Sequence, residues 1–324
     1  MKKLLLFPGA SPTTVLGYGT TSLMGVSTSG ERLALLEAAF DAGIRHFDTA
    51  PYYGYGEAER VLGDFISDKR DQVTITTKFG MQAPAVVKLR LVNLLARQIL
   101  RLLPGIRQVL SKKAQSLSKK GAFSPDAARR SLDQSLKALR TDHVDLFLLH
   151  EPTFSDASSD EIHAFLEEEV WRGRIRAYGC GGEFSAIQPI AEAHLPTSGW
   201  LQFEDNVLSR RIELIRATGS RCVTYRTFHQ ALPLLANWLA SNPEVQSEWE
   251  SQLNLSLIEN GALSGMMLAA SLARNQEGIV LFSSSRSDRI HDAVRVAKGE
   301  MFSTQQIGLF IELTRSLPPL HRAQ

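Results

Sequence analysis

The stretch HFDTAPYYGYGEAE, residues 46–59, joins a short apolar run to a segment rich in tyrosine and glycine. Asp48 ends the apolar run, and Tyr53 is the second of three tyrosines that follow it. A polar residue at the end of a β-rich run is typical of a strand that delivers a side chain to a site at its carboxyl end. An aromatic turn packed for stability is the other interpretation. The rest of the chain decides between them.

Short β-rich runs alternate with longer helical patterns, which is typical of a parallel sheet surrounded by helices. We expect eight strands, over residues 15–19, 46–48, 73–78, 144–150, 177–180, 200–204, 222–225 and 279–282. Helical patterns lie between them, over residues 31–42, 57–68, 124–140, 159–172, 185–193, 210–217 and 288–298. Ser124 and Pro125 form a helix-start signal. The segment 230–274 is longer than one helix and is expected to hold two.

Eight strand–helix units favour a closed (β/α)8 barrel of the TIM type, an α/β fold in which a single domain spans residues 1–324. An open doubly wound sheet is disfavoured, because its GxGxxG turn should follow the first strand. The chain instead has LGYGTTSLMG over residues 16–25. Active sites of such barrels lie at the carboxyl ends of the strands, so polar residues at those positions are the candidates.

The overall composition is that of a globular protein and excludes several function classes. A net charge of +2 disfavours a general polyanion binder, so no nucleic acid partner is predicted. Cys180 and Cys222 give no disulfide framework, which favours a cytoplasmic location. No apolar run is long enough to cross a membrane, and the apolar run of residues 4–7 is too short for a secretion signal. The histidines outside the candidate site lack metal-ligand spacing, so no metal is predicted.

Residues 81–123 break this rhythm, because they contain no Asp or Glu and carry nine basic residues. Their apolar residues recur at helical spacing, at Leu91, Leu95, Ile99, Leu102 and Ile106. The pattern predicts a basic amphipathic helical insertion after the third strand. Two interpretations stay open. The insertion either packs on the barrel as a solvated helix, or it lies at the barrel mouth, where it shapes the pocket or weakly contacts acidic partners or a membrane surface.

Three neighbouring strands end in polar residues: Asp48 after the second, Lys78 after the third and His150 after the fourth. A buried ammonium and a buried carboxylate stabilise one another when paired, and a purely structural ion pair would leave His150 and Tyr53 unexplained. A free tyrosine has a pKa near ~10, and a neighbouring ammonium lowers the pKa of a phenol. The set therefore predicts a proton donor aimed at a carbonyl that receives a hydride, with His150 donating to the carbonyl oxygen. No side chain carries hydride, so a cofactor is required.

These blocks resemble those of the aldo-keto reductase family. The opening stretch is similar to the family's DTAxxYGxGxxE signature, and TTKFG around Lys78 and DLFLLHEP around His150 are similar to two further family blocks. The resemblance implies a (β/α)8 barrel and NADPH-dependent reduction of an aldehyde or ketone, a small-molecule carbonyl substrate. It casts Tyr53 as the general acid, supported by Asp48, Lys78 and His150.

The cofactor positions that the resemblance implies match less completely. Gln202 corresponds to a glutamine that touches the nicotinamide amide, and Tyr225 to an aromatic residue that stacks on the nicotinamide ring. Where the family has a Ser-Asn pair that holds the carboxamide, this chain has Gly181 and Gly182, which leaves backbone or water to substitute. The last strand and the helix after it form an anion site for the adenosine phosphate of NADPH, with Ser283, Ser284, Ser285, Arg286 and Arg289 as candidates.

A second hypothesis places the chain in another class, as a nicotinamide-binding regulatory or partner subunit with little catalysis. The potassium-channel β subunits are relatives of this fold that act mainly in this way. The missing Ser-Asn pair and the basic insertion motivate this alternative. The four catalytic residue types at neighbouring strand ends argue against it.

Overall fold

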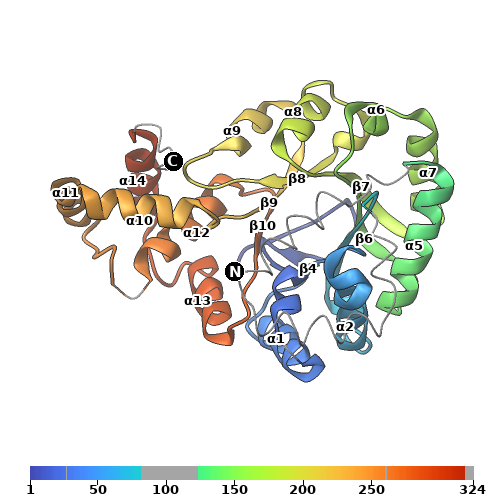
Figure 1. The fold of residues 1–324 in the computed structure, drawn as a ribbon, viewed down its shortest axis with the longest axis horizontal. Helices are drawn as coiled ribbons and strands as arrows, with labels where there is room; N and C mark the ends of the chain where they lie inside the picture. Colours follow the sequence, from blue (N-terminus) through green and yellow to red (C-terminus); the bar gives the residue numbers. More distant parts are fainter. Residues whose placement is uncertain (27, 82–122, 260, 318–324) are drawn as a thin grey trace, which may run out of the picture.

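The computed structural model describes residues 1–26, 28–81, 123–259 and 261–317. In them, eight parallel strands close into a barrel in the order β10-β3-β4-β5-β6-β7-β8-β9 (Figure 1). The strands are β3 (Leu16–Gly19), β4 (His46–Asp48), β5 (Thr74–Phe79), β6 (Val144–His150), β7 (Ile175–Gly181), β8 (Trp200–Glu204), β9 (Arg221–Tyr225) and β10 (Ile279–Phe282). The expected (β/α)8 barrel is confirmed, and each expected strand lies within two residues of an observed one. That one domain spans residues 1–324 stays a prediction.

Helices cover the outside of the barrel between successive strands (Figure 1). Those that coincide with expected segments are α1 (Ser29–Asp41), α2 (Glu57–Phe65), α5 (Pro125–Leu139), α7 (Asp160–Trp171), α8 (Phe184–Glu192), α9 (Arg211–Ile215) and α13 (Ser287–Ala297). The predicted start of α5 is confirmed, because the Ser124 side chain accepts a hydrogen bond from the backbone N–H of Ala127. A short helix, α6 (Phe154–Ala157), precedes α7 and was not expected. The predicted basic insertion after β5 lies, except for its two end residues, outside the described residues.

The prediction of two helices in residues 230–274 was wrong, because three occupy this segment: α10 (Ala231–Ser241), α11 (Pro243–Leu253) and α12 (Ala262–Arg274). Pro243 starts α11 as its first residue, so the chain turns at Asn242 instead of continuing α10. Asn254 then adopts a left-handed backbone with φ 48° and ends α11. α14 (Thr304–Arg315), also not predicted, packs against α11 and α12 at one side of the barrel (Figure 1).

The amino end of the barrel is closed by a small hairpin that the sequence patterns did not predict, formed by β1 (Lys3–Leu4) and β2 (Thr13–Thr14). Between these strands, Leu6 is only 1% exposed and joins an apolar cluster inside the barrel. Its carbonyl accepts hydrogen bonds from Trp200 Nε1 at 3.2 Å and Arg221 Nη1 at 2.9 Å, which lie at the starts of β8 and β9. The carboxyl ends of the strands face the opposite side.

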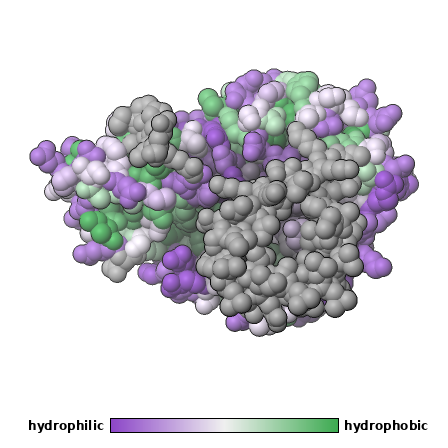
Figure 2. All heavy atoms as spheres, in the orientation of Figure 1, coloured by the Kyte–Doolittle hydropathy of each residue, from purple (hydrophilic) through white to green (hydrophobic). Residues whose placement is uncertain are grey.

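Figure 2 shows one face of the molecule, on which hydrophilic and hydrophobic residues are interspersed among the residues that the structure describes. Among the described residues, no helix is long and apolar enough to cross a membrane. The same part of the chain contains no group of three or more His, Cys, Asp or Glu residues arranged to hold a metal ion. The carboxyl ends of the barrel strands, where active sites of such barrels lie, hold the candidate site.

Candidate active site

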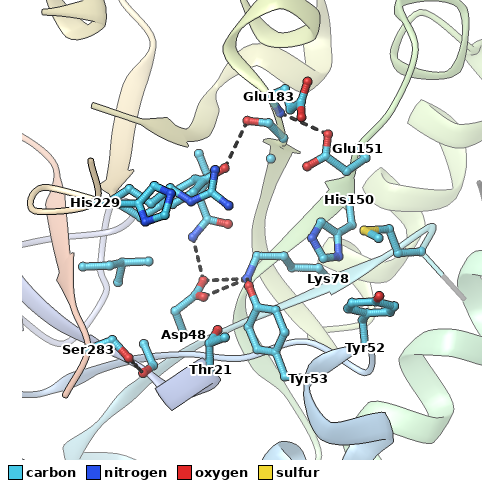
Figure 3. A pocket seen from close by; sticks show the side chains of 18 of the residues that line it. Thr21, Asp48, Tyr52, Tyr53, Lys78, His150, Glu151, Glu183, His229 and Ser283 are labelled. Carbon is cyan, nitrogen blue, oxygen red and sulfur yellow. Dashed lines mark hydrogen bonds and ion pairs between the residues drawn. The ribbon is translucent and has the colours of Figure 1, made fainter. Parts of the chain in front are cut away.

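A cavity of about 1090 Å³ opens at the carboxyl ends of the barrel strands (Figure 3). Three of its lining residues come from strand ends: Asp48 from β4, Lys78 from β5 and His150 from β6. Tyr53 reaches the same cavity from the loop after β4. The structure thus brings all four residues of the predicted catalytic set together, although they span more than one hundred positions of sequence.

The Lys78 ammonium lies at the centre of this group. Its Nζ donates to both carboxylate oxygens of Asp48, at 2.8 and 2.9 Å, and to the carbonyl of Thr49 at 3.0 Å. The Tyr53 hydroxyl lies 3.3 Å away from the same nitrogen. Burial alone would lower the pKa of Lys78, but the charge of Asp48 and the Tyr53 hydroxyl outweigh it, so this pKa is raised. Lys78 therefore stays charged beside the phenol.

Glycines shape the turn that presents Tyr53. Gly54, Tyr55 and Gly56 all have left-handed backbones, with φ of 59°, 58° and 86°. Gly54 also packs closely against Met24. A Cβ at this position would lie 2.0 Å from the Met24 sulfur, so there is no room for a side chain. Glycine is the residue that adopts this conformation without strain, so the YGYG segment places the Tyr53 side chain at the cavity.

Glu59, the last residue of the stretch that identified the loop, fixes α2 beneath the site. Its carboxyl group accepts a hydrogen bond of 2.7 Å from Thr77 in β5, the residue before Lys78. Burial raises the pKa of Glu59, against the opposing effect of that hydrogen bond. The helix after the Tyr53 loop is thereby tied to the strand that carries Lys78.

His150 lies at the other side of the phenol. Its ring meets the Tyr53 ring edge to face, with centroids 6.3 Å apart. Burial, followed by the nearby positive charge of Lys78, lowers the pKa of His150 to about 3. The imidazole is therefore neutral at physiological pH. A neutral imidazole carries one N–H, which can donate to an oxygen held beside the Tyr53 hydroxyl.

The predicted nicotinamide residues line the same cavity. The Gln202 side chain is almost fully buried, and its Nε2 donates to Asp48 at 2.8 Å. The Tyr225 hydroxyl donates to the carbonyl of Gly182 at 3.4 Å. Gly181 and Gly182 border the cavity between these two side chains. The flat phenol ring, the buried amide and the two glycines thus line the same cavity as Asp48 and Lys78.

The serine-rich turn is brought to the cavity only in part. Ser283 lines it and donates to the carbonyl of Gly19 at 2.7 Å, whereas the other four candidates lie further along, at the start of α13. Ser284 is buried and accepts from the backbone N–H of Arg286 at 3.1 Å. Arg286 forms an ion pair with Asp288, which the sequence patterns did not indicate. Ser285 and Arg289 are exposed.

Sequence reasoning missed charged residues at the rim of the cavity. Glu151 follows His150 with a left-handed φ of 59°, and its carboxylate accepts from the backbone N–H of Glu183 at 3.0 Å (Figure 3). Arg226, also left-handed, forms an ion pair of 2.9 Å with Glu204. The one available signal was position, since both Glu151 and Arg226 directly follow the ends of barrel strands.

Two buried histidines make the stability depend on pH. His46 contacts the hydroxyl groups of Thr74 and Thr76 inside the barrel, and burial followed by the charge of Lys78 lowers its pKa to about 3, as for His150. An unfolded histidine has a pKa near ~6.5. Between pH 3 and 6.5 the unfolded state therefore binds more protons, so stability rises with pH across this window and is lost as pH falls.

Each histidine should contribute a slope of about 1.4 kcal/mol per pH unit within that window. The measurement is urea unfolding at pH 7, 6, 5 and 4 for the wild type and for His46→Asn. The variant should show a shallower loss of free energy of unfolding between pH 6 and 4. Equal slopes for the two proteins would contradict a neutral, buried His46.

The chain is similar in sequence to proteins of one known family. The model of the aldo/keto reductase family matches residues 15–314. Pyridoxal 4-dehydrogenase of Microbacterium luteolum is 33% identical over 185 residues, which are 56% of this chain and 49% of that protein. D-threo-aldose 1-dehydrogenase of Pseudomonas sp. is 32% identical over 188 residues, 56% of this chain and 54% of that protein. The chain spans about half the length of these curated relatives.

Solved structures share the fold over nearly the whole chain. The aldo-keto reductase AKR11C1 from Bacillus halodurans, in its holo form, superposes with a TM-score of 0.67 at 18% identity, covering 100% of this chain and 99% of that one. The glycerol dehydrogenase AKR11B4 from Gluconobacter oxydans gives a TM-score of 0.68 at 17% identity, covering 99% and 98%. At these identities the likeness establishes the barrel fold.

Proposed function

Because the chain belongs to the aldo/keto reductase family, we propose that it is a cytoplasmic oxidoreductase that reduces an aldehyde or ketone to an alcohol with NADPH. The observation that carries this proposal is the Lys78 ammonium, which is held by Asp48 and lies 3.3 Å from the Tyr53 hydroxyl. This arrangement stabilises the phenolate that remains after proton donation.

The proton chemistry follows from the four side chains. The Tyr53 hydroxyl donates its proton to the substrate oxygen as negative charge develops there. Lys78 stabilises the resulting phenolate, and Asp48 keeps the ammonium in place. The neutral His150 donates its N–H to the same substrate oxygen and orients the carbonyl. A nicotinamide cofactor, when bound in this cavity, would supply the hydride that these residues cannot.

The residues around the cavity fit that cofactor. Tyr225 provides an aromatic face, and Gln202 provides a buried amide whose orientation is fixed by Asp48. The start of α13 offers backbone N–H groups to an anion, with Ser283, Ser284 and Ser285 before it. Arg286 and Arg289 are the proposed partners of a 2′-phosphate, so NADPH is proposed over NADH. A bound phosphate would compete with Asp288 for Arg286.

One part of the cavity lining is polar and can contact a polar substrate. Polar or charged residues from the segments after four barrel strands border it: Thr21, Glu151, Glu183, Arg226 and His229. The names of the two curated relatives specify pyridoxal and a D-threo-aldose, both polar. We therefore propose a hydroxylated or otherwise polar carbonyl compound, assayed in both directions because both relatives are named as dehydrogenases.

The test is to titrate NADPH and NADH into the purified protein by intrinsic fluorescence and then follow oxidation of the reduced cofactor with polar aldehydes and ketones. We expect NADPH to bind more tightly than NADH and to be consumed. An Arg286→Ala/Arg289→Ala variant should weaken NADPH binding and leave NADH binding unchanged. Tight binding without turnover would favour the regulatory-subunit alternative, and binding of neither nucleotide would contradict the proposal.

A further inference from the structure

Two acceptor side chains border the space above the glycines at the end of β7. A Cβ built on Gly181 would lie 3.1 Å from Gln202 Oε1, and one built on Gly182 would lie 2.7 Å from Glu151 Oε2. Both glycines and both acceptors line the same cavity. A side chain at Gly182 would displace the Glu151 carboxylate, so this glycine and this carboxylate depend on one another.

The orientation of the Gln202 amide follows from its partner. Its Nε2 lies 2.8 Å from Asp48 Oδ2, and a carboxylate oxygen that also contacts the Lys78 ammonium is an acceptor. The amide nitrogen must therefore face Asp48, which turns the amide oxygen toward Gly181. Gln202 consequently presents an acceptor, not a donor, to the cavity.

Glu151 is also held in place. Its left-handed backbone turns the chain back at the end of β6, and its Oε2 accepts from the backbone N–H of Glu183 at 3.0 Å. A carboxylate has two oxygens with about four lone-pair sites, so the group as a whole can accept several hydrogen bonds at once. Figure 3 shows Glu151 and Glu183 joined at one side of the cavity, with the Asp48–Lys78 pair across from them.

Two acceptors that line one cavity together with the Tyr225 ring suit a planar group with two N–H bonds. We propose that Glu151 is a cofactor-binding residue: its carboxylate accepts one N–H of the nicotinamide carboxamide, and Gln202 Oε1 accepts the other. This inference rests on the proposed function and adds to the site the residue that directly follows β6. Hydrogen bonds to a charged acceptor are stronger than neutral ones, so Glu151 fixes the rotation of the carboxamide and with it the ring face presented to the substrate.

The test compares two nucleotides, NADPH and its 3-acetylpyridine analogue, in which a methyl ketone replaces the primary amide and removes both N–H donors. Dissociation constants are measured by fluorescence titration. The wild type should prefer NADPH by about tenfold or more, as expected for a hydrogen bond to a charged group. The Glu151→Ala variant should lose most of this preference. Its dissociation constant for NADPH should rise, while its dissociation constant for the analogue should stay almost unchanged.

Matched variants separate this role from charge and from folding. Glu151→Gln keeps the shape and one acceptor oxygen, so its preference should be intermediate. Glu192→Gln removes the same charge from the far end of α8, where Glu192 contacts Gln188, and should keep the wild-type preference. Gly182→Ser should displace the Glu151 carboxylate and weaken NADPH binding, with little further loss when combined with Glu151→Ala. Thermal unfolding confirms that each variant is folded.

Three results would overturn the inference. The Glu151→Ala substitution could weaken the binding of both nucleotides equally, or it could change only the KM for the carbonyl substrate. It could also leave the preference for NADPH over the 3-acetylpyridine analogue intact. In each case the wild type still binds NADPH and turns over, so the proposed function stands. If the wild type binds neither nucleotide, the proposed function fails and the inference fails with it.

Discussion

Replacing Tyr53 by phenylalanine should lower kcat by at least about 10²–10⁴-fold, the range that a positioned general acid contributes. The substitution removes only the hydroxyl that lies 3.3 Å from Lys78, and the ring keeps its edge-to-face contact with His150. The Kd for NADPH should stay within about twofold, because a hydrogen bond made only in the transition state adds nothing to ground-state binding. Single-turnover kinetics and fluorescence titration measure the two quantities.

Tyr55→Phe is the matched control for this experiment. Tyr55 lies two residues further along the same turn and is 45% exposed, and it is not among the residues that line the cavity. The control should keep wild-type kcat. Turnover that persists in Tyr53→Phe would rule out Tyr53 as the acid, and a loss shared by both variants would point to the turn itself.

Lys78→Met should cost both stability and activity. Lys78 and Asp48 are each 2% exposed, so removing the ammonium leaves a buried carboxylate with Gln202 as its remaining side-chain hydrogen-bond partner. Breaking a buried ion pair in this way costs about 3–5 kcal/mol of the free energy of unfolding. Turnover should fall to background, because the phenolate of Tyr53 loses its neighbouring positive charge.

The double variant Asp48→Asn/Lys78→Met separates the two effects. Without the carboxylate no buried charge is left unpaired, so most of the lost stability should return. Activity should not return, since the ammonium is still missing. Urea unfolding and turnover are measured on the wild type, the single variant and the double variant. Equal free energies of unfolding for the single and double variants would show that the unpaired Asp48 carboxylate does not destabilise the Lys78→Met variant as expected.

The barrel strands could be predicted because local patterns determine them. Parallel strands inside a barrel are short apolar runs, and each is separated from the next by a helix with its own start signal, as at Ser124 and Pro125. Three of the four proposed catalytic residues could be found for the same reason. Asp48, Lys78 and His150 each lie at the end of a strand, so sequence position alone predicted that they meet.

Features that depend on contacts between distant segments could not be predicted. The strands of the β1–β2 hairpin have two residues each, too few to show an alternating pattern, and the hairpin is held by the contacts of Leu6 with Trp200 and Arg221. The third helix in residues 230–274 was missed although Asn242-Pro243 was a visible break signal.

The position of Glu151 shows the same limit within the site. At the end of β7, this chain has Gly181 and Gly182 where the family has a Ser-Asn pair, so the sequence shows no side-chain donors there. The carboxylate that fills the space above Gly182 comes from another strand, and it arrives there through a left-handed backbone at Glu151. Neither that backbone conformation nor the approach of Glu151 to Gly182 has a signature in either segment alone.

The closure of one end of the barrel by the β1–β2 hairpin bears on how the protein can be used. Lys3 is exposed on this hairpin, next to the Leu6 contacts with Trp200 and Arg221. A solid support coupled through Lys3 would hold each molecule at the amino end of its barrel. The carboxyl ends of the strands would then point away from the support. A layer immobilised in this way would present the cavity of every molecule to the flowing solution, so small molecules in a packed reactor could reach it freely.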